Sequence, residues 1–422
     1  MRYPLDLLPG GGASPDLLDV WRARALWPVL SFTTPEGERV LACGTAARAE
    51  SLAPSQDWQR ELRAHLTTLR GGELCALCDD GPPALVTVPF DPSRAHDARW
   101  GTLARVAVHI PMLAVVTGGR HDGIFTTGEH MNASAIVACC TAPDDTRPLP
   151  ATDDDHTPAS PASYPDAVRA ALARIAAGEA EKIVVAREAE ESFPRQMRLA
   201  PLTRALATEH PSSYNLLLAE SDNRIFLSAT PERLARVERH EIRTEAMAGT
   251  LVGTDGADAS NLDDKTAREH EAVVRMITGA LGGICASVGT GARGLRQVGD
   301  VRHVVTPIAG VLAKGADLVD AVAVLHPTPA VAGTPREAAL AAIGAIEQFD
   351  RGLYAGVVAL IDARGDGDAA VALRSALVTG ERVVLHAGAG IVAGSDPHAE
   401  ERETDAKLGA MRAVLARAAS DA

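Results

Sequence analysis

Basic side chains are scarce relative to acidic ones in this 422-residue chain. It has 41 lysines and arginines against 55 aspartates and glutamates, a formal net charge of −14 with histidine neutral. This balance argues against a general nucleic-acid-binding protein, which needs a basic surface to neutralise phosphates. Aromatic residues make up only 3% of the chain, so stacking surfaces for single-stranded bases are not expected either.

Long apolar runs are also absent. No stretch reaches the roughly 18 apolar residues that a membrane-spanning helix needs. The segment Met1 to Asp6 lacks the apolar centre of a secretory signal, so we expect a cytoplasmic protein without a membrane partner. Apolar residues at 46% and charged residues at 23% are typical of an ordinary globular protein.

Cysteine is sparse, with six residues in the whole chain: Cys43, Cys75, Cys78, Cys139, Cys140 and Cys285. Cys75 and Cys78 have C-x-x-C spacing, but no second pair follows at a zinc-finger distance. Six cysteines are too few for a disulfide scaffold of this length. We therefore expect free thiols in a reducing compartment.

The chain divides into three parts by composition. Residues 1–145 contain short apolar runs broken by Gly and Pro, which predict strands of a mostly antiparallel sheet. Residues 146–162 are rich in Thr, Pro and Asp and predict a loop or linker. Residues 163–422 mix helical and strand patterns without regular alternation. This mixture favours an α+β fold, continuous with the first part, over a doubly wound sheet.

The clearest patterns predict individual elements. Apolar spacing and breaker residues indicate helices over 166–178, 262–281, 335–346 and 397–417. Strands are predicted at 27–32, 84–90, 106–110, 182–187, 354–362, 369–378 and 382–387, with a hairpin of 215–219 and 224–228. The last helix begins with the capping sequence Ser395-Asp396-Pro397.

The last predicted helix carries two carboxylates on one face. Glu400 and Glu403 are three residues apart, and Lys407 follows one turn later. A third carboxylate, Glu269, lies in another predicted helix. Each could belong to a solvated surface, but together they would suit a hard cation such as Mg²⁺, which prefers oxygen ligands.

A glycine-rich run at 387–391 precedes this helix, but its spacing does not match a dinucleotide-binding fingerprint. Its exposed backbone N–H groups would suit a carboxylate instead. Arg374 is a charged residue within the predicted strand 369–378, where an arginine usually has a bound anion or an ion-pair partner.

A series of motifs resembles the chorismate-utilising enzymes over residues 163–415. The matching runs are KIVVAR at 182–187, ATPERL at 229–234, AGT at 248–250, KTAREH at 265–270, LHPTPAVAGTP at 325–335, FDRGLYAG at 349–356, AGAGI at 387–391 and ExxETxxK at 400–407. Each motif alone is modest, but all of them occur in the family's order. The resemblance implies two large, mostly antiparallel sheets that face each other, with helices outside and the active site between them.

The resemblance also implies roles for individual residues. Glu269 and Glu403 match Mg²⁺ ligands, with Glu400 binding directly or through water. The expected substrate-binding residues are Gly249, Thr250, His303, Ala330, Tyr354, Arg374, Gly388 and Lys407. His326 matches a family histidine near the substrate ring or its supporting shell. Thr266 departs from the pattern, because many relatives carry an acidic residue there.

Family members differ in the nucleophile that attacks chorismate. In the branch that uses water, the base and the acid resemble Lys182 and Glu232. Aminating relatives usually carry glutamine at the first of these positions, and some carry a nucleophilic lysine where this chain has Ala248. Salicylate synthases tend to carry threonine where this chain has Ala330.

We therefore expect an isochorismate synthase, an isomerase that needs Mg²⁺ but no amidotransferase partner, acting as a monomer. A salicylate synthase remains the alternative. A protein of a different functional class, an inactive regulatory relative that binds chorismate, is the third possibility. The product would feed siderophore, menaquinone or salicylate-derived pathways, which the sequence does not separate.

Overall fold

The computed structural model describes residues 2–8, 14–71, 83–119, 122–127, 132–141, 163–192, 198–251, 264–298 and 301–421. Cys75, Cys78 and the predicted linker 146–162 lie outside these ranges. The other four cysteines are free thiols, as predicted. Within the described ranges, no helix has the length and apolar character needed to cross a membrane.

The strands of the described residues all belong to one hydrogen-bonded network, and every pairing in it is antiparallel. The strands are β1 Arg2–Tyr3, β2 Val29–Thr33, β3 Arg39–Glu50, β4 Ala84–Val88, β5 Ala107–Thr117, β6 Gly123–Thr126, β7 Lys182–Ser192, β8 Tyr214–Ser221, β9 Arg224–Thr230, β10 Arg233–Glu238, β11 Glu241–Leu251, β12 Cys285–Thr290, β13 Gly294–Val298, β14 Val301–Leu312, β15 Gly333–Thr334, β16 Val357–Ile361, β17 Gly367–Val371, β18 Ser375–Thr379 and β19 Arg382–Val392.

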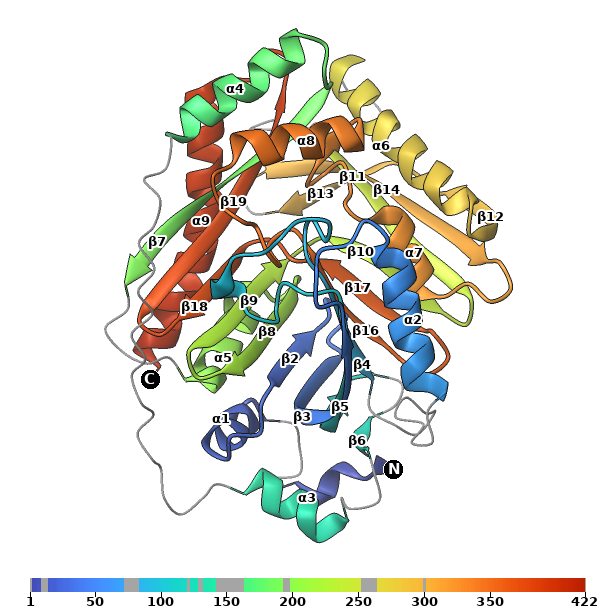
Figure 1. Cartoon of the computed structure of the whole chain (residues 1–422), viewed down its shortest axis with the longest axis vertical. Coiled ribbons are helices and arrows are strands. Elements are labelled where there is room, and N and C mark those ends of the chain that lie inside the picture. The colour runs from blue at the N-terminus through green and yellow to red at the C-terminus, as the bar shows by residue number, and fades with distance from the viewer. Residues whose placement is uncertain are drawn as a thin grey trace.

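This network has two arms. The first arm runs from β3 through β2, β8, β9, β18, β19 and β7 to β15. The second runs from β4 through β16, β17, β10 and β11 to β14, which also pairs with β12 and β13. The long strand β5 joins them, because it pairs with β3 on one side and with β4 on the other. Figure 1 shows β7 and β19 of the first arm and β11 and β14 of the second on opposite sides of the upper part of the molecule.

Helices cover the outside of both arms (Figure 1). They are α1 Asp16–Ala23, α2 Trp58–Gly71, α3 Ala133–Cys140, α4 Tyr164–Ala176, α5 Leu199–Glu209, α6 Asp264–Gly282, α7 Leu318–Leu325, α8 Arg336–Ile346 and α9 Pro397–Ser420, with short 3₁₀ turns at Leu5–Leu7 and Ala98–Trp100. Helices α1, α3, α5 and α9 pack against one face of the first arm. Helices α2, α4, α6, α7 and α8 contribute to the larger core on the other side.

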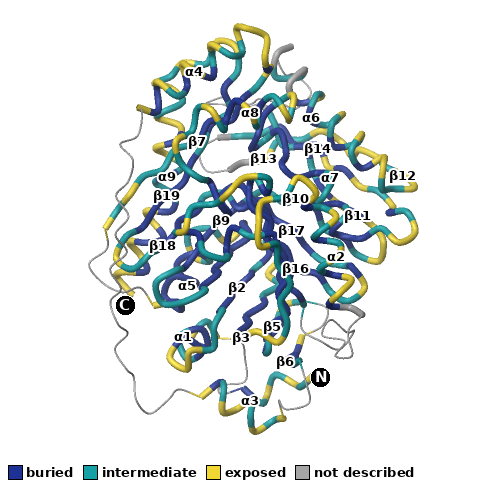
Figure 2. Tube along the Cα trace, in the orientation of Figure 1, coloured by how far each residue is buried: buried dark blue, intermediate teal, exposed yellow. Residues whose placement is uncertain are grey.

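Strand β8 illustrates how the first arm is buried on both faces. Leu216 and Leu218 belong to the larger core, whereas Leu217 and Ala219 face the core beneath α5 and α9. Because successive side chains of a strand alternate between faces, an unbroken apolar run fits a strand with no solvent face. Figure 2 shows this burial along the central strands, with exposed residues confined mainly to helices and turns.

The α+β class with large antiparallel sheets is confirmed, and most predicted elements appear. Strands β5, β7, β8, β9 and β19 are longer than predicted, whereas β2, β4 and β16 are shorter. One prediction is wrong. Residues 369–378 do not form a single strand, because the chain breaks between β17 and β18. Arg374 lies in this break with a φ of 45°, a left-handed conformation incompatible with a continuous strand.

Candidate active site

A cavity of about 890 Å³ opens between the two arms. Strands β7 and β19 of the first arm line one side, and β11 and β14 of the second arm line another. The N-terminal half of α9 completes the wall. A volume of this size is typical of a site for a small organic ligand. Predicted site residues from segments far apart in the sequence therefore converge on one space.

Lys182, the first residue of β7, lies in this cavity against Gly390 of β19. A Cβ atom built on Gly390 would come within 2.6 Å of the Lys182 Cε atom and 3.2 Å of its Nζ atom. Any side chain at position 390 would therefore displace the lysine. This close approach explains why glycine occupies position 390 of the AGAGI run, because the absence of a side chain there leaves space for the Lys182 side chain.

Glu232 follows β9 and lines the same cavity. The Thr328 hydroxyl donates a hydrogen bond to its Oε1 atom at 3.2 Å. Burial raises the pKa of Glu232 to about 7, although that hydrogen bond and the charge of Lys182 oppose the rise. A carboxyl with this pKa is partly protonated near neutrality, as a general acid must be.

Tyr354, Arg374 and Gly388 converge on another part of the cavity. The Tyr354 hydroxyl lies against Gly388, since a Cβ there would come within 3.0 Å of it. Ala355, directly after the tyrosine, also has a positive φ of 60°. Left-handed backbone at Ala355 and Arg374 costs about 1–3 kcal/mol per residue, and such strain often accompanies functional sites.

Arg374 has no ion-pair partner among the described residues, and burial lowers the pKa of its guanidinium. The conformation of the break therefore presents a cation to the cavity rather than to solvent or to a protein carboxylate. An anionic ligand would complete this arrangement.

Helix α9 contributes three charged residues, as predicted. Asp396 caps its N-terminus by accepting a hydrogen bond from the Ala399 backbone N–H at 2.7 Å. Glu400, Glu403 and Lys407 all line the cavity. The Lys407 Nζ atom lies 2.7 Å from Glu403 Oε1 and donates to the Gly388 carbonyl at 2.8 Å. This pairing joins the carboxylate face of α9 to the glycine-rich strand.

Burial raises the pKa of Glu400, and the neighbouring Glu403 carboxylate adds to the effect. Two carboxylates one helical turn apart, facing a cavity, form an oxygen donor set that fits Mg²⁺. The third predicted ligand, Glu269, belongs to α6, but its side chain lies outside the described residues. Among the side chains that are described, no group of three or more His, Cys, Asp or Glu is placed to hold a metal ion.

The second arm supplies the facing wall. Thr250 of β11 pairs with His303 of β14, and His303 lines the cavity together with Ala248 and Thr266. Burial lowers the pKa of His303, and the charges of Lys407 and Arg374 lower it further. The side chains at positions 249 and 250 lie outside the described residues. Ala330 also lines the cavity.

His326 does not line the cavity. It is buried, with its Nε2 atom 2.9 Å from the Pro89 carbonyl oxygen and its ring 5.9 Å from that of Trp58. Burial lowers the pKa of His326 to about 4, so the ring is neutral and Nε2–H donates to the carbonyl. Of the two places expected for His326, the substrate ring and its supporting shell, the first is not met, and the contact with Pro89 joins the two halves of the chain.

Arg351 and His386 are among the cavity residues that were not predicted. Arg351 is buried and forms an ion pair with Glu347 at 2.5 Å. It belongs to the FDRGLYAG motif, which could have signalled it. His386 precedes the AGAGI run, and nothing in its local sequence distinguishes it.

Residues 31–416 match the family model described as chorismate binding enzyme. The chain belongs to this family. It is 30% identical to the isochorismate synthase MenF of Bacillus subtilis, over 79% of this chain and 75% of that protein. It is 33% identical to the salicylate biosynthesis isochorismate synthase of Pseudomonas aeruginosa, over 77% and 72%. The solved structure of MenF from Escherichia coli superposes with a TM-score of 0.75 at 27% identity, covering 98% of this chain and 93% of that one.

Membership in the chorismate-binding enzymes makes the chain an enzyme that acts on chorismate. It also accounts for the convergence of cationic side chains, because chorismate carries two carboxylates.

Proposed function

We propose that this chorismate-binding enzyme is an isochorismate synthase that depends on Mg²⁺. The observation that carries the proposal is the pair formed by Lys182 and Glu232. Both line one cavity, and the carboxyl has a pKa of about 7. Two relatives from different organisms are isochorismate synthases, and the match with this chain extends over more than two thirds of the length of each.

The reaction replaces the C4 hydroxyl of chorismate by a hydroxyl at C2. Neutral Lys182 takes a proton from water while the water oxygen forms a bond to C2, both ring double bonds shift by one position, and the C4–O bond breaks. Protonated Glu232 gives its proton to the departing hydroxyl, which leaves as water. One water enters and one leaves, so the product is an isomer of the substrate. A base and an acid on the same cavity fit this proton balance.

Arg374, Lys407 and the Tyr354 hydroxyl would orient a carboxylate of the substrate, since all three line the cavity and the last two lie against Gly388. Glu400 and Glu403 would hold Mg²⁺, with Glu269 as the third ligand. The ion would supply positive charge for the second carboxylate. Neither ammonia nor an amidotransferase subunit takes part in this reaction, and we propose that the monomer is active.

The test is incubation with chorismate and Mg²⁺ in H₂¹⁸O, followed by chromatography and mass spectrometry. We expect isochorismate with one ¹⁸O atom in its C2 hydroxyl. Salicylate and pyruvate as main products would instead identify a salicylate synthase. Activity only with ammonia would identify an aminating enzyme, and binding of chorismate without turnover would identify an inactive relative.

A further inference from the structure

His386 contacts two aromatic rings at the edge of the cavity. Its ring stacks on Tyr354, with centroids 5.2 Å apart and an interplanar angle of 16°. It also contacts Trp100, with centroids 5.4 Å apart and an interplanar angle of 31°. Only 14 aromatic residues occur in the chain, as four Trp, four Tyr and six Phe. Two of these few aromatic residues therefore contact the same buried histidine at the cavity.

Polar groups hold the edges of the same ring. The His386 Nε2 atom lies 3.4 Å from Glu188 Oε1, and the Nδ1 atom lies 3.4 Å from the Ser375 hydroxyl. Arg99 donates two hydrogen bonds to Glu188, at 2.5 and 3.1 Å. Burial opposes ionisation of Glu188, but contacts with His386 and Arg99 outweigh it and lower the pKa of this carboxyl.

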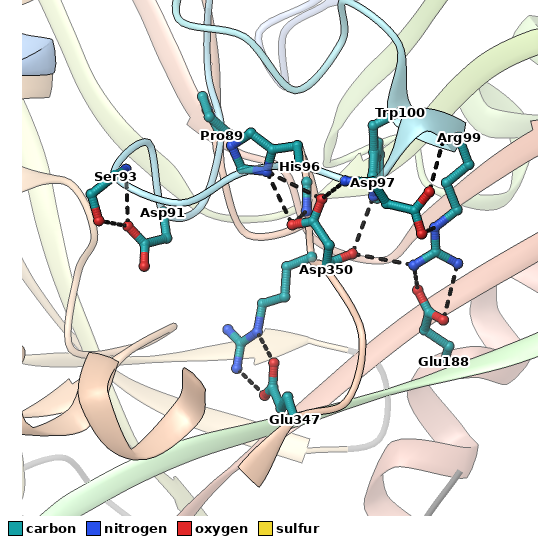
Figure 3. Close-up of polar contacts among 12 residues, drawn as sticks. Pro89, Asp91, Ser93, His96, Asp97, Arg99, Trp100, Glu188, Glu347 and Asp350 are labelled. Carbon is teal, nitrogen blue, oxygen red and sulfur yellow. Dashed lines mark hydrogen bonds and ion pairs between the residues drawn. The ribbon is translucent and has the colours of Figure 1, made fainter. Parts of the chain in front are cut away.

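Hydrogen bonds connect the surroundings of His386 to residues 96–100 in the N-terminal part of the chain. The Trp100 indole N–H donates to the Asp350 carbonyl at 3.1 Å, and Arg99 donates to the same oxygen at 3.3 Å. The Asp350 carboxylate accepts from the Asp97 backbone N–H at 2.8 Å and lies 3.1 Å from the His96 ring. Figure 3 shows Arg99 between Asp350 and Glu188, so residues 96–100 connect the FDRGLYAG segment to β7.

Two cavity residues depend on the position of the His386 ring. Tyr354 stacks on it and presents its hydroxyl at Gly388. Ser375, at its Nδ1 edge, directly follows Arg374 and its left-handed backbone. Movement of the ring would therefore shift the hydroxyl and the guanidinium that face the ligand, but neither Lys182 nor Glu232.

We infer that His386 is a positioning residue for the anionic end of the substrate, and that residues 96–100 of the N-terminal region hold it in place. The inference rests on the proposed function, because it takes Tyr354 and Arg374 as contacts of a chorismate carboxylate. It gives the N-terminal third a part in substrate binding as well as in the scaffold.

The test compares His386→Leu with His386→Phe. Leucine keeps the volume but loses the planar ring, whereas phenylalanine keeps the ring contacts with Trp100 and Tyr354. We expect His386→Leu to raise the KM for chorismate about tenfold and to leave kcat within about threefold, because the stack positions a binding group. His386→Phe should keep KM within about threefold of the native value.

Leu385→Ala is the matched control, since Leu385 is buried on the opposite face of β19. It should lower the melting temperature without raising KM. Calorimetric titration with chorismate gives the dissociation constant directly, so the comparison stands even if the product is not isochorismate. Equal affinity of His386→Leu and the native enzyme would overturn the inference. A fall in kcat at constant KM, or equal losses in both His386 variants, would overturn it as well.

Discussion

Gly390→Ala tests whether Lys182 must occupy its observed position. An added Cβ would lie 2.6 Å from the Lys182 Cε atom. Carbon atoms rest about 3.5 Å apart, so Cε must retreat by about 0.9 Å. A misplacement of roughly 1 Å at a reacting group can cost about 100-fold in rate. We therefore expect kcat to fall about 100-fold, which corresponds to about 2.7 kcal/mol of activation free energy.

The same substitution should scarcely affect stability. The obstructing atoms are the far end of a flexible side chain, and alanine reduces the entropy of the unfolded chain, so the free energy of unfolding should change by less than about 1 kcal/mol. Steady-state kinetics with chorismate and thermal denaturation measure the two quantities. Gly289→Ala in β12 is the control, because no described atom lies within 4 Å of its added Cβ. Native-like kcat in a folded Gly390→Ala variant would refute the role of the Lys182 position.

The other predictions concern the acid, the base and the metal. Since Glu232 must be protonated to act as the acid, kcat/KM should decline as pH rises through about 7, and Glu232→Gln should lack this decline. A native profile without an alkaline limb near 7 would contradict this. Lys182→Ala should abolish turnover but keep chorismate binding in calorimetry; near-normal kcat would place water activation elsewhere. Glu403→Gln should raise the Mg²⁺ concentration for half-maximal activity at least tenfold, and an unchanged requirement would disprove its ligand role.

The pKa of Glu232 also affects stability. Because its value of about 7 in the folded state exceeds the ordinary value of 4.5, folding favours the protonated form. The resulting stabilisation is complete below about pH 4.5 and is lost as pH rises through about 7. Glu232→Gln cannot ionise, so the melting temperature of this variant should fall less than that of the native enzyme between pH 6 and pH 8.

The elements that could be predicted were those with a local signal. Helix α9 has a cap at Asp396 and a proline in its first turn, and its start was predicted correctly. Strand β14 was not predicted, because it contains Pro307 and Gly310, residues that weaken a strand pattern. It pairs with its sequence neighbours β12 and β13 and with β11, which is distant in sequence. The break at Arg374 was likewise missed, since an arginine gives no local signal for a left-handed φ.

The residues of the site also divide into those with a local sequence signal and those without one. Helical spacing alone placed Glu400, Glu403 and Lys407 on one face, and the structure brings all three to the cavity. The family motifs placed Lys182 and Glu232 there. His386 could not be predicted, because its setting depends on Trp100, nearly 300 residues earlier in the chain. Only the fold brings such partners together.

The acidic excess and the anionic substrate are compatible because the cavity has its own charge balance. Arg351 is paired with Glu347 and Lys407 with Glu403, whereas Arg374 has no ion-pair partner among the described residues. One such cation matches one of the two carboxylates of chorismate. The second carboxylate would meet Glu400 and Glu403 and be repelled by them. A divalent cation on this face, as we propose, would reverse the sign of that interaction and favour binding of the second carboxylate.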